Sequence, residues 1–119
     1  DGRSLVQIQS PRPLNMNLSI NIFYTTCGSA KQSKKLAKAM LSDKMIVCVN
    51  IVKNVESYYR DCGSLKKSNE SILLIKTFHT KKKIENLIKK NHPYDIPFLV
   101  QLETKKVNSE YILWARKNI

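Results

Sequence analysis

The spacing of apolar and polar residues along the chain predicts four strands. From Leu18 to Tyr24 every second residue is apolar, which is the period expected of a strand with one covered face. The runs 45–52 and 72–75 are almost entirely apolar, which is typical of strands covered on both faces. We therefore expect strands at 18–26, at 45–52 continuing past a turn or bulge at 53–54 into 55–61, at 70–78 and at 98–103.

Between these strands, apolar residues recur at helical spacing. In 30–42 and 81–91 they fall on one side of a helix, and lysines take the other side. Ser29 and Thr80 precede the two segments, and hydroxyl side chains there commonly accept a hydrogen bond from the first turn of a helix. A third helix, capped by Asn108, is predicted to end at residue 118.

The predicted order is strand, helix, bent strand, strand, helix, strand and a final helix. The first six elements follow the βαββαβ plan of the ferredoxin-like sandwich. This α+β fold has a four-stranded antiparallel sheet with two helices on one face, to which the extra C-terminal helix is added. The other face of 46–52 and 72–75 is also apolar and needs a protein cover. The final helix can cover only part of it, so we expect a homo-oligomer.

The chain length of 119 residues suits one domain. Residues 1–15 are rich in turn-forming residues and show no helical period, so we expect a disordered tail or an expression remnant there. Residues 16–119 are then a single domain. No apolar run approaches the roughly 18 residues of a membrane span, and we expect no membrane contact.

The three cysteines, Cys27, Cys48 and Cys62, contain no CxxC pair. This pattern argues against a disulfide framework and against a cysteine-rich zinc site, so we expect a reduced, cytoplasmic protein. Cys48 lies in an apolar run and is expected to be a small buried side chain. Cys27 stands beside Gly28 near a predicted helix start, where a thiol pKa is often lowered, and it is a candidate pocket residue.

Lysines and arginines number 21 against nine acidic residues, which gives a net charge of +12. A charge of this sign favours phosphates or acidic surfaces as partners. The lysines are spread along the chain at polar positions, however, as on a solvated surface. The Lys/Arg-Gly-aromatic-Gly/Ala-Phe string of an RNA-recognition motif is absent. We therefore do not expect nucleic acid as a partner, although a basic face remains the alternative.

The string HPYDIP at 92–97 joins the second predicted helix to the last predicted strand. Each proline fixes its own φ and restricts the residue before it, so the connector is expected to be rigid. His92 is one of two histidines, and histidine is the commonest metal ligand. One imidazole seldom holds a metal tightly. His92 is therefore either a ligand completed by other side chains or a turn residue whose ring bonds to neighbouring backbone.

Two more side chains are candidates for a small-ligand pocket. Tyr94 either lines a pocket near a subunit interface or packs its ring against the sheet with its hydroxyl bonded. Lys76 lies inside an apolar strand, where it extends to water, pairs with a carboxylate such as Glu70 or Asp95, or binds an anionic ligand. The second histidine, His79, is expected to be a solvated or capping residue.

Nothing in the pattern of residues indicates catalysis. We find no Ser-His-Asp set and no close carboxylate pair with an obvious role. The chain has three glycines, too few for a glycine-rich phosphate loop. We expect a protein that is not an enzyme.

The order of elements, together with short strings at matching spacing, resembles the CutA family of divalent-cation tolerance proteins. The resemblance covers about residues 18–116, and the connector string is its strongest part. The matching strings are Tyr24-Thr25-Thr26, Cys48-Val49-Asn50-Ile51, Ser57-x-Tyr59 followed by Gly63, Glu70 leading into Leu74-Ile75-Lys76-Thr77, His92-Pro93-Tyr94-x-x-Pro97, and Tyr111-x-x-Trp114.

This resemblance implies a ferredoxin-like protomer in a homotrimer whose sheets meet edge to edge, similar in shape to PII signalling proteins. It also implies a non-enzymatic role in tolerance of copper and other divalent cations. The family's copper ligands, a cysteine and two adjacent histidines, fall at Thr25, Asn91 and His92. Only His92 is kept, so Cu(II) or another divalent cation is expected to bind weakly. The alternative is a PII-like sensor of a small anionic ligand in an inter-subunit cleft.

Overall fold

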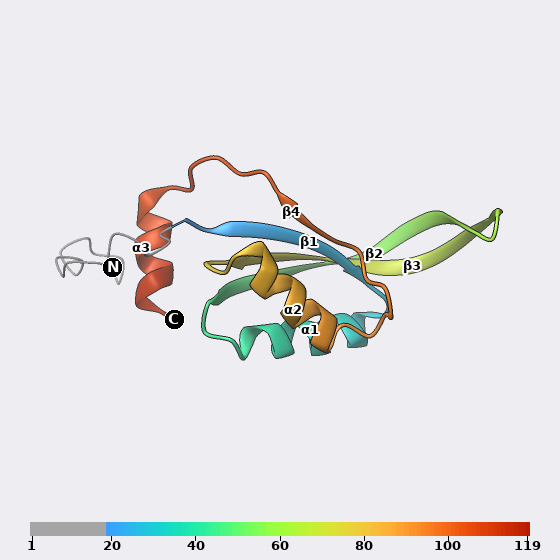
Figure 1. Cartoon of the computed structure of the whole chain (residues 1–119), viewed down its shortest axis with the longest axis horizontal. Helices are drawn as coiled ribbons and strands as arrows, with labels where there is room; N and C mark the ends of the chain where they lie inside the picture. The colour runs from blue at the N-terminus through green and yellow to red at the C-terminus, as the bar shows by residue number, and fades with distance from the viewer. Residues whose placement is uncertain (1–18) are drawn as a thin grey trace.

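Strands and helices follow one another in the predicted order (Figure 1). The computed structural model describes residues 19–119, so the expectation for residues 1–15 lies outside the described part of the chain. The α+β class and the extra C-terminal helix are confirmed. The elements are β1 (Asn21–Cys27), α1 (Ala30–Leu41), β2 (Ile46–Asp61), β3 (Ser64–Thr77), α2 (Lys81–Asn91), β4 (Leu99–Leu102) and α3 (Ser109–Lys117).

The four strands form one antiparallel sheet in the order β2-β3-β1-β4. In the register of the two central strands, Phe23 lies opposite Ile75 and Thr25 lies opposite Leu73. All four side chains are buried. Because successive residues of a strand point to opposite faces, this register defines one face that packs against the helices. Both the order and the antiparallel pairing are those of the ferredoxin-like plan.

The helices α1 and α2 pack together on that face of the sheet (Figure 1). Leu36 and Met40 of α1 are buried against it, as are Ile84 and Ile88 of α2. Burying a side chain of this size contributes roughly 1.5–3 kcal/mol relative to leaving it exposed. The apolar layer under the helices therefore accounts for most of what holds them in place.

The predicted N-caps have different outcomes. The Ser29 hydroxyl accepts a hydrogen bond from the backbone N–H of Gln32 at 3.2 Å, which confirms Ser29 as the cap of α1. Thr80 and Asn108 hold the N-cap positions of α2 and α3, but neither side chain makes a capping hydrogen bond. The predicted N-cap positions are therefore confirmed at these two helices, without the side-chain hydrogen bond.

The opposite face of the sheet bears neither α1 nor α2. Tyr24 lies between Leu74 and Val100 there, and Ile22 and Ile72 lie one pair away on either side. These five side chains, which we call the open face, are half-buried. An apolar surface of this kind is typical of faces that pack against another protein surface.

The β2–β3 hairpin extends beyond the body of the sheet (Figure 1). It closes between Asp61 and Ser64 through a two-residue turn, in which Cys62 has φ 49° and Gly63 has φ 80°. A turn with positive φ at both central residues matches the twist of the flanking strands, and glycine adopts it without steric cost.

The prediction that the strand after this turn begins at residue 70 is wrong, because β3 begins at Ser64. Residues 64–69 are mostly polar and lack β-branched side chains, so their sequence carries no strand signal. Pairing with β2 supplies the order that the local sequence does not indicate. The break predicted at 53–54 is a β-bulge at which Asn54 has φ 60°.

Helix α3 lies at the end of the sheet remote from the hairpin (Figure 1). It completes a second apolar cluster in which Ile20, Phe78 and Ala115 are buried, and Tyr111 and Trp114 pack against them. The sheet is therefore bounded by α3 at one end and continues into the hairpin at the other.

Candidate functional site

The connector lies against the end of β1, at residues that we call the connector corner: Thr25, Thr26, His92, Tyr94 and Phe98. Helix α2 ends at Asn91, and its C-cap His92 donates its backbone N–H to Ile88 O at 2.8 Å. His92 has φ −74° and ψ 139°, the extended conformation favoured before a proline. The proline after His92 thus ends the helix and turns the histidine ring toward β1.

Both ring nitrogens of His92 are engaged by backbone groups. Nε2 lies 2.7 Å from Thr26 O, and the backbone N–H of Tyr94 lies 3.0 Å from Nδ1. A carbonyl oxygen only accepts and a backbone N–H only donates, so Nε2 carries the proton and Nδ1 offers its lone pair. The side chain is the neutral Nε2–H tautomer, in a residue that is 8% exposed. This geometry fits the interpretation of His92 as a turn residue whose ring bonds to neighbouring backbone.

The other two positions of the family's copper ligands also make backbone hydrogen bonds. Thr25 is fully buried, and its hydroxyl donates to Phe98 O at 2.7 Å. Asn91 donates from Nδ2 to Leu87 O at 2.9 Å, within α2. Thr25 and His92 together fasten the connector to β1 at both of its ends. What occupies the ligand positions is therefore a set of hydrogen bonds that stabilises the corner.

Tyr94 packs its ring against His92, with ring centres 4.8 Å apart. Its hydroxyl donates to Glu70 Oε2 at 2.8 Å. Burial, and then the hydrogen bond and charge of Glu70, raise the pKa of Tyr94 far above its usual value. The phenol is therefore a proton donor to Glu70 over the physiological range. This geometry fits the predicted role in which the ring of Tyr94 packs and its hydroxyl is bonded. The sequence did not indicate Glu70 as the partner of that hydroxyl.

The three predicted pocket residues are not brought to one place. Cys27 is fully buried beside Gly28, and the hydroxyl of Tyr94 is near the same glycine. Lys76 lies opposite Ile22, whereas Cys27 lies opposite Ser71. Lys76 and Ser71 are therefore roughly 17 Å apart along β3, at about 3.4 Å per residue. The ammonium of Lys76 lies 5.5 Å from the ring centre of Tyr111 and makes no ion pair with a carboxylate of residues 19–119.

A preformed metal centre does not fit the side chains of the described residues. Among residues 19–119, no three His, Cys, Asp or Glu side chains lie close enough to hold one ion. His92 has no free lone pair, because Nδ1 already accepts from Tyr94. A cation that used His92 would first have to displace one of these two backbone bonds.

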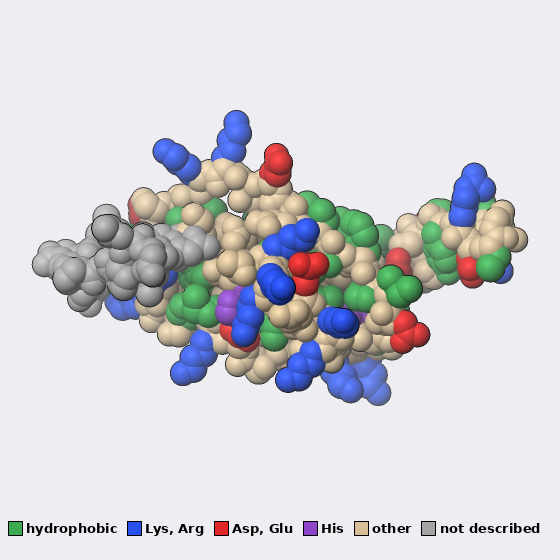
Figure 2. Space-filling view, viewed as in Figure 1, with side chains coloured by type: hydrophobic (Ala, Val, Ile, Leu, Met, Phe, Trp, Pro, Cys, Tyr) green, Lys and Arg blue, Asp and Glu red, His purple; other side chains and the backbone are tan. Residues whose placement is uncertain are grey.

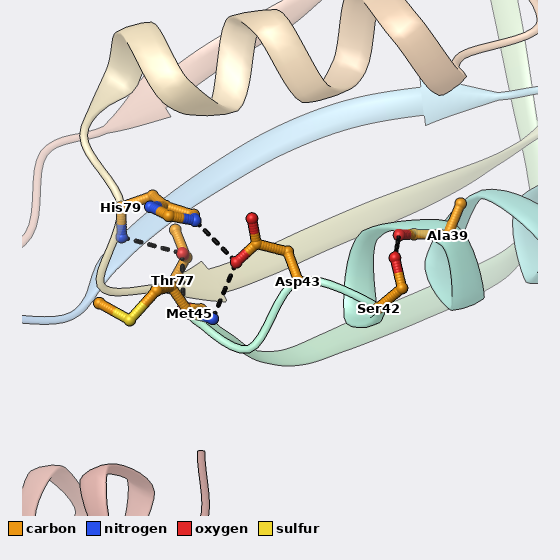
Figure 3. A network of polar contacts seen from close by, with 6 residues as sticks. All are labelled: Ala39, Ser42, Asp43, Met45, Thr77 and His79. Carbon is orange, nitrogen blue, oxygen red and sulfur yellow. Dashed lines mark hydrogen bonds and ion pairs between the residues drawn. The ribbon is translucent and has the colours of Figure 1, made fainter.

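His79 belongs to a polar network that its sequence context did not predict (Figure 3). Its Nε2 lies 2.8 Å from Asp43 Oδ1, which also accepts the backbone N–H of Met45 at 2.9 Å. The Thr77 hydroxyl donates to Met45 O and accepts from the backbone N–H of His79. The expectation of a solvated or capping histidine is wrong, because His79 pairs with Asp43 across 36 residues of sequence.

Burial alone would raise the pKa of Asp43, but the surroundings reverse this effect. The N–H of Met45, the ring and charge of His79, and the charge of Lys83 hold the pKa of Asp43 below its ordinary value near 3.8. Asp43 is therefore ionised over the physiological range. The network joins the loop after α1 to the end of β3, and we treat it as structural.

Sheet order, hairpin and connector corner together define a class: a ferredoxin-like α+β protein with an extended β2–β3 hairpin and a C-terminal helix. Residues 21–118 match the family model described as "CutA1 divalent ion tolerance protein". The chain therefore belongs to the CutA1 family, and the resemblance seen in the sequence is confirmed.

Individual relatives agree with this assignment. The chain is 36% identical over 94 residues to the divalent-cation tolerance protein CutA of Thermus thermophilus, covering 78% of this chain and 91% of that one. It is 33% identical over 98 residues to the chloroplastic protein CutA 1 of Oryza sativa, where it spans 82% of this chain but 55% of the rice protein. The crystal structure of CutA1 from Oryza sativa superposes with a TM-score of 0.78 at 30% identity, over 87% of this chain and 96% of that one.

Proposed function

We propose that the chain is a non-enzymatic homotrimer that acts in tolerance of divalent cations, copper among them. Its relatives are named for divalent-cation tolerance, and that name does not describe an enzyme. The observation that carries the trimer is the half-buried open face, which lies beside two sheet edges that pair with no strand of residues 19–119. The number of subunits follows from the family resemblance.

The two free edges suit association in a ring. β2 and β4 are the outer strands of the sheet, so each presents unpaired backbone groups on one side. A groove of about 560 Å³ runs along β4 and is lined by residues 99–104 together with Asn21 and Lys81. If the β2 edge of one subunit approaches the β4 edge of the next, the contact is head-to-tail and closes when the rotation is one third of a turn.

Exposed apolar side chains lie where such neighbours would pack. Ile96 is 92% exposed and Phe98 56% on the connector, and Tyr58 and Leu65 stand out from the hairpin. Phe98 packs edge-to-face on Tyr24 of the open face, with ring centres 5.7 Å apart. These residues support an assembly in which connector and hairpin both meet a neighbouring subunit.

Metal binding through His92 stays a prediction, and the geometry sets its strength. Any bond from His92 to Cu(II) would replace a bond to Thr26 or to Tyr94. A buried backbone group that loses its partner costs about 1–3 kcal/mol, so the affinity is expected to be low. We therefore place the tolerance function in the assembled protein and not in a tight copper centre.

The alternative of a small anionic ligand is less well supported. It needed Lys76 beside Tyr94 and Cys27, and Lys76 lies near the other end of β3. The cavity between Gly28 and Glu70 measures about 70 Å³. Pockets for small molecules are usually about 300–1,000 Å³, so this cavity is too small for such a ligand.

The cytoplasm remains the expected location. No helix among the described residues is long and apolar enough to cross a membrane. Some relatives carry other locations in their names, such as the chloroplastic protein of Oryza sativa.

A complementation experiment tests the proposed function. The chain is expressed in a copper-sensitive bacterium that lacks its own CutA, and growth is measured against copper concentration. Leu74→Glu places a charge in the open face, and Asn86→Glu places the same charge on the exposed side of α2. We expect Asn86→Glu to restore growth like the wild type and Leu74→Glu to fail, because a buried unpaired carboxylate prevents association.

Failure of the wild-type chain to restore growth would remove the tolerance function. Full rescue by a Leu74→Glu chain that is monomeric would show that the function does not need the assembly.

A further inference from the structure

We propose that the outer surface of α1 and α2 binds the phosphate backbone of a nucleic-acid duplex without reading its sequence. Along the chain the lysines are spread out, and for that reason we expected them only to be solvated. In the folded chain, nine of them lie on the layer formed by α1 and α2. Neither the assembly nor the tolerance role proposed above is needed for this inference.

Helix α1 contributes a stripe of four charges. Lys31, Lys34, Lys35 and Lys38 are spaced by three and four residues and are all exposed. They occupy the side opposite the buried Leu36. Helix α1 contains no acidic residue, so nothing on the helix itself offsets this charge.

Helix α2 adds five lysines and one acidic residue, Glu85. Lys81, Lys82 and Lys83 occupy its first turn, and no carboxylate accompanies them there. Cations at the N-terminus of a helix oppose the macrodipole. These positions therefore work against the stability of the isolated helix, which is expected where charge serves binding.

None of the nine lysines forms an ion pair within the described chain, although the charge of Lys83 helps to lower the pKa of Asp43. Among residues 19–119, Lys67 pairs with Glu56 and His79 pairs with Asp43, and neither pair uses a lysine of α1 or α2. Figure 2 shows blue side chains over the side of the molecule on which the two helices lie, and others on the loop before α3 and on the hairpin. We call the surface over α1 and α2 the lysine face.

The side chains of the lysine face favour a nucleic-acid duplex over other partners. Large exposed apolar residues are absent from it except Leu41 at the end of α1, and it has no aromatic side chain. Protein interfaces use aromatic anchors and are poor in lysine, interfacial membrane helices insert an apolar face, and single strands stack on aromatic rings. A duplex needs only cations placed against its phosphates.

The size of the lysine face suits a short length of duplex. With 12 and 11 residues, α1 and α2 are about 18 Å and about 16 Å long at 1.5 Å per residue. One strand of B-DNA carries a phosphate every 3.4 Å of helix axis, so this length meets about four or five phosphates. Four such contacts give a slope of about −3.6 for the logarithm of affinity against that of salt concentration.

Fluorescence anisotropy of a labelled DNA duplex of about 20 base pairs tests the proposal, at about 50 and about 200 mM salt. One variant replaces the four lysines of α1 with glutamine: Lys31→Gln, Lys34→Gln, Lys35→Gln and Lys38→Gln. The matched control makes the same change at four exposed lysines elsewhere: Lys53→Gln, Lys66→Gln, Lys105→Gln and Lys106→Gln. Each of the two fourfold variants lowers the net charge of +12 by four. Glutamine has a helix propensity similar to that of lysine.

We expect the α1 variant to bind at least about tenfold more weakly at the lower salt concentration, with a shallower salt slope, and the control to stay within about threefold of the wild type. Equal loss in both variants would reduce the effect to net charge and overturn the assignment to the helices. Absence of wild-type binding at the lower salt would overturn it as well. So would tighter binding to a single strand, or to phosphatidylserine vesicles, than to the duplex.

Discussion

At the scale of single residues, the connector corner works through hydrogen bonds to the backbone. His92 bonds to Thr26 O and to the N–H of Tyr94, and Thr25 bonds to Phe98 O. Each of these side chains satisfies a backbone group where β1 meets the connector. We therefore interpret the residues at the copper-ligand positions implied by the resemblance as structural.

Replacing His92 separates the two interpretations. His92→Ala leaves two backbone groups without partners and is expected to lower the free energy of unfolding by about 2–4 kcal/mol. His92→Asn keeps an acceptor near Nδ1 and His92→Gln keeps a donor near Nε2, so each should lose less. Urea unfolding of the three variants gives the comparison.

Calorimetric titration with Cu(II) completes this test. We expect weak binding that changes little in His92→Ala. A wild-type dissociation constant below about 1 μM that is lost in His92→Ala would instead show that the ring is a metal ligand.

Residue types in the sequence predicted part of this corner but not its contacts. The restriction that Pro93 places on the residue before it was predictable, and His92 has the expected extended conformation. The bond from His92 to Thr26 spans 66 residues and depends on how β1 ends beside α2. The partner of Tyr94, Glu70, lies on a different strand, and no local pattern indicates that contact.

At the scale of elements, loops and strand ends are joined by polar contacts. Asp43 follows α1, His79 follows β3, and Asn21 at the start of β1 donates from Nδ2 to His79 O at 2.8 Å. Three elements that are distant in sequence are held together at this end of the sheet.

The Asp43 carboxylate makes the stability of this junction depend on pH. Its pKa in the folded protein is below the ordinary value, so its contribution is present above about pH 4 and is lost as the pH falls through the folded value. Asp43→Asn is expected to lower stability by about 1 kcal/mol near neutral pH and to converge with the wild type in acid. Thermal unfolding at several pH values measures this. The control Asp95→Asn, at an exposed position of the connector, should run parallel to the wild type; a parallel curve for Asp43→Asn would contradict the role of the network.

Elements with a clear hydrophobic period were predictable, and those held by pairing were not. α1 and α2 begin and end within a residue of the predicted ranges because their buried sides follow the helical period. The polar half of the hairpin, 64–69, was missed because register with β2 orders it. The bulge at Asn54 was predictable from the Lys53-Asn54 break between two strand-forming runs.

At the scale of the whole molecule, the sheet presents two unlike surfaces. α1 and α2 cover one face and carry the lysines outward, while the open face and the edges of β2 and β4 meet no strand or helix layer of residues 19–119. The half-buried Tyr24, Ile72 and Leu74 explain why apolar residues occur on both sides of the central strands. A neighbouring subunit on this surface leaves most of the lysine face outward, with Lys81 at the border because it also lines the β4 groove, so the two proposals are compatible.

The mass of the purified chain in solution tests the central claim most directly. Multi-angle light scattering at several protein concentrations should give about 41 kDa, three times the 13.7 kDa of one chain. The trimer is expected to persist on dilution, because apolar faces and sheet edges are buried together. A mass of one chain across the concentration range would contradict the assembly on which the proposed function rests.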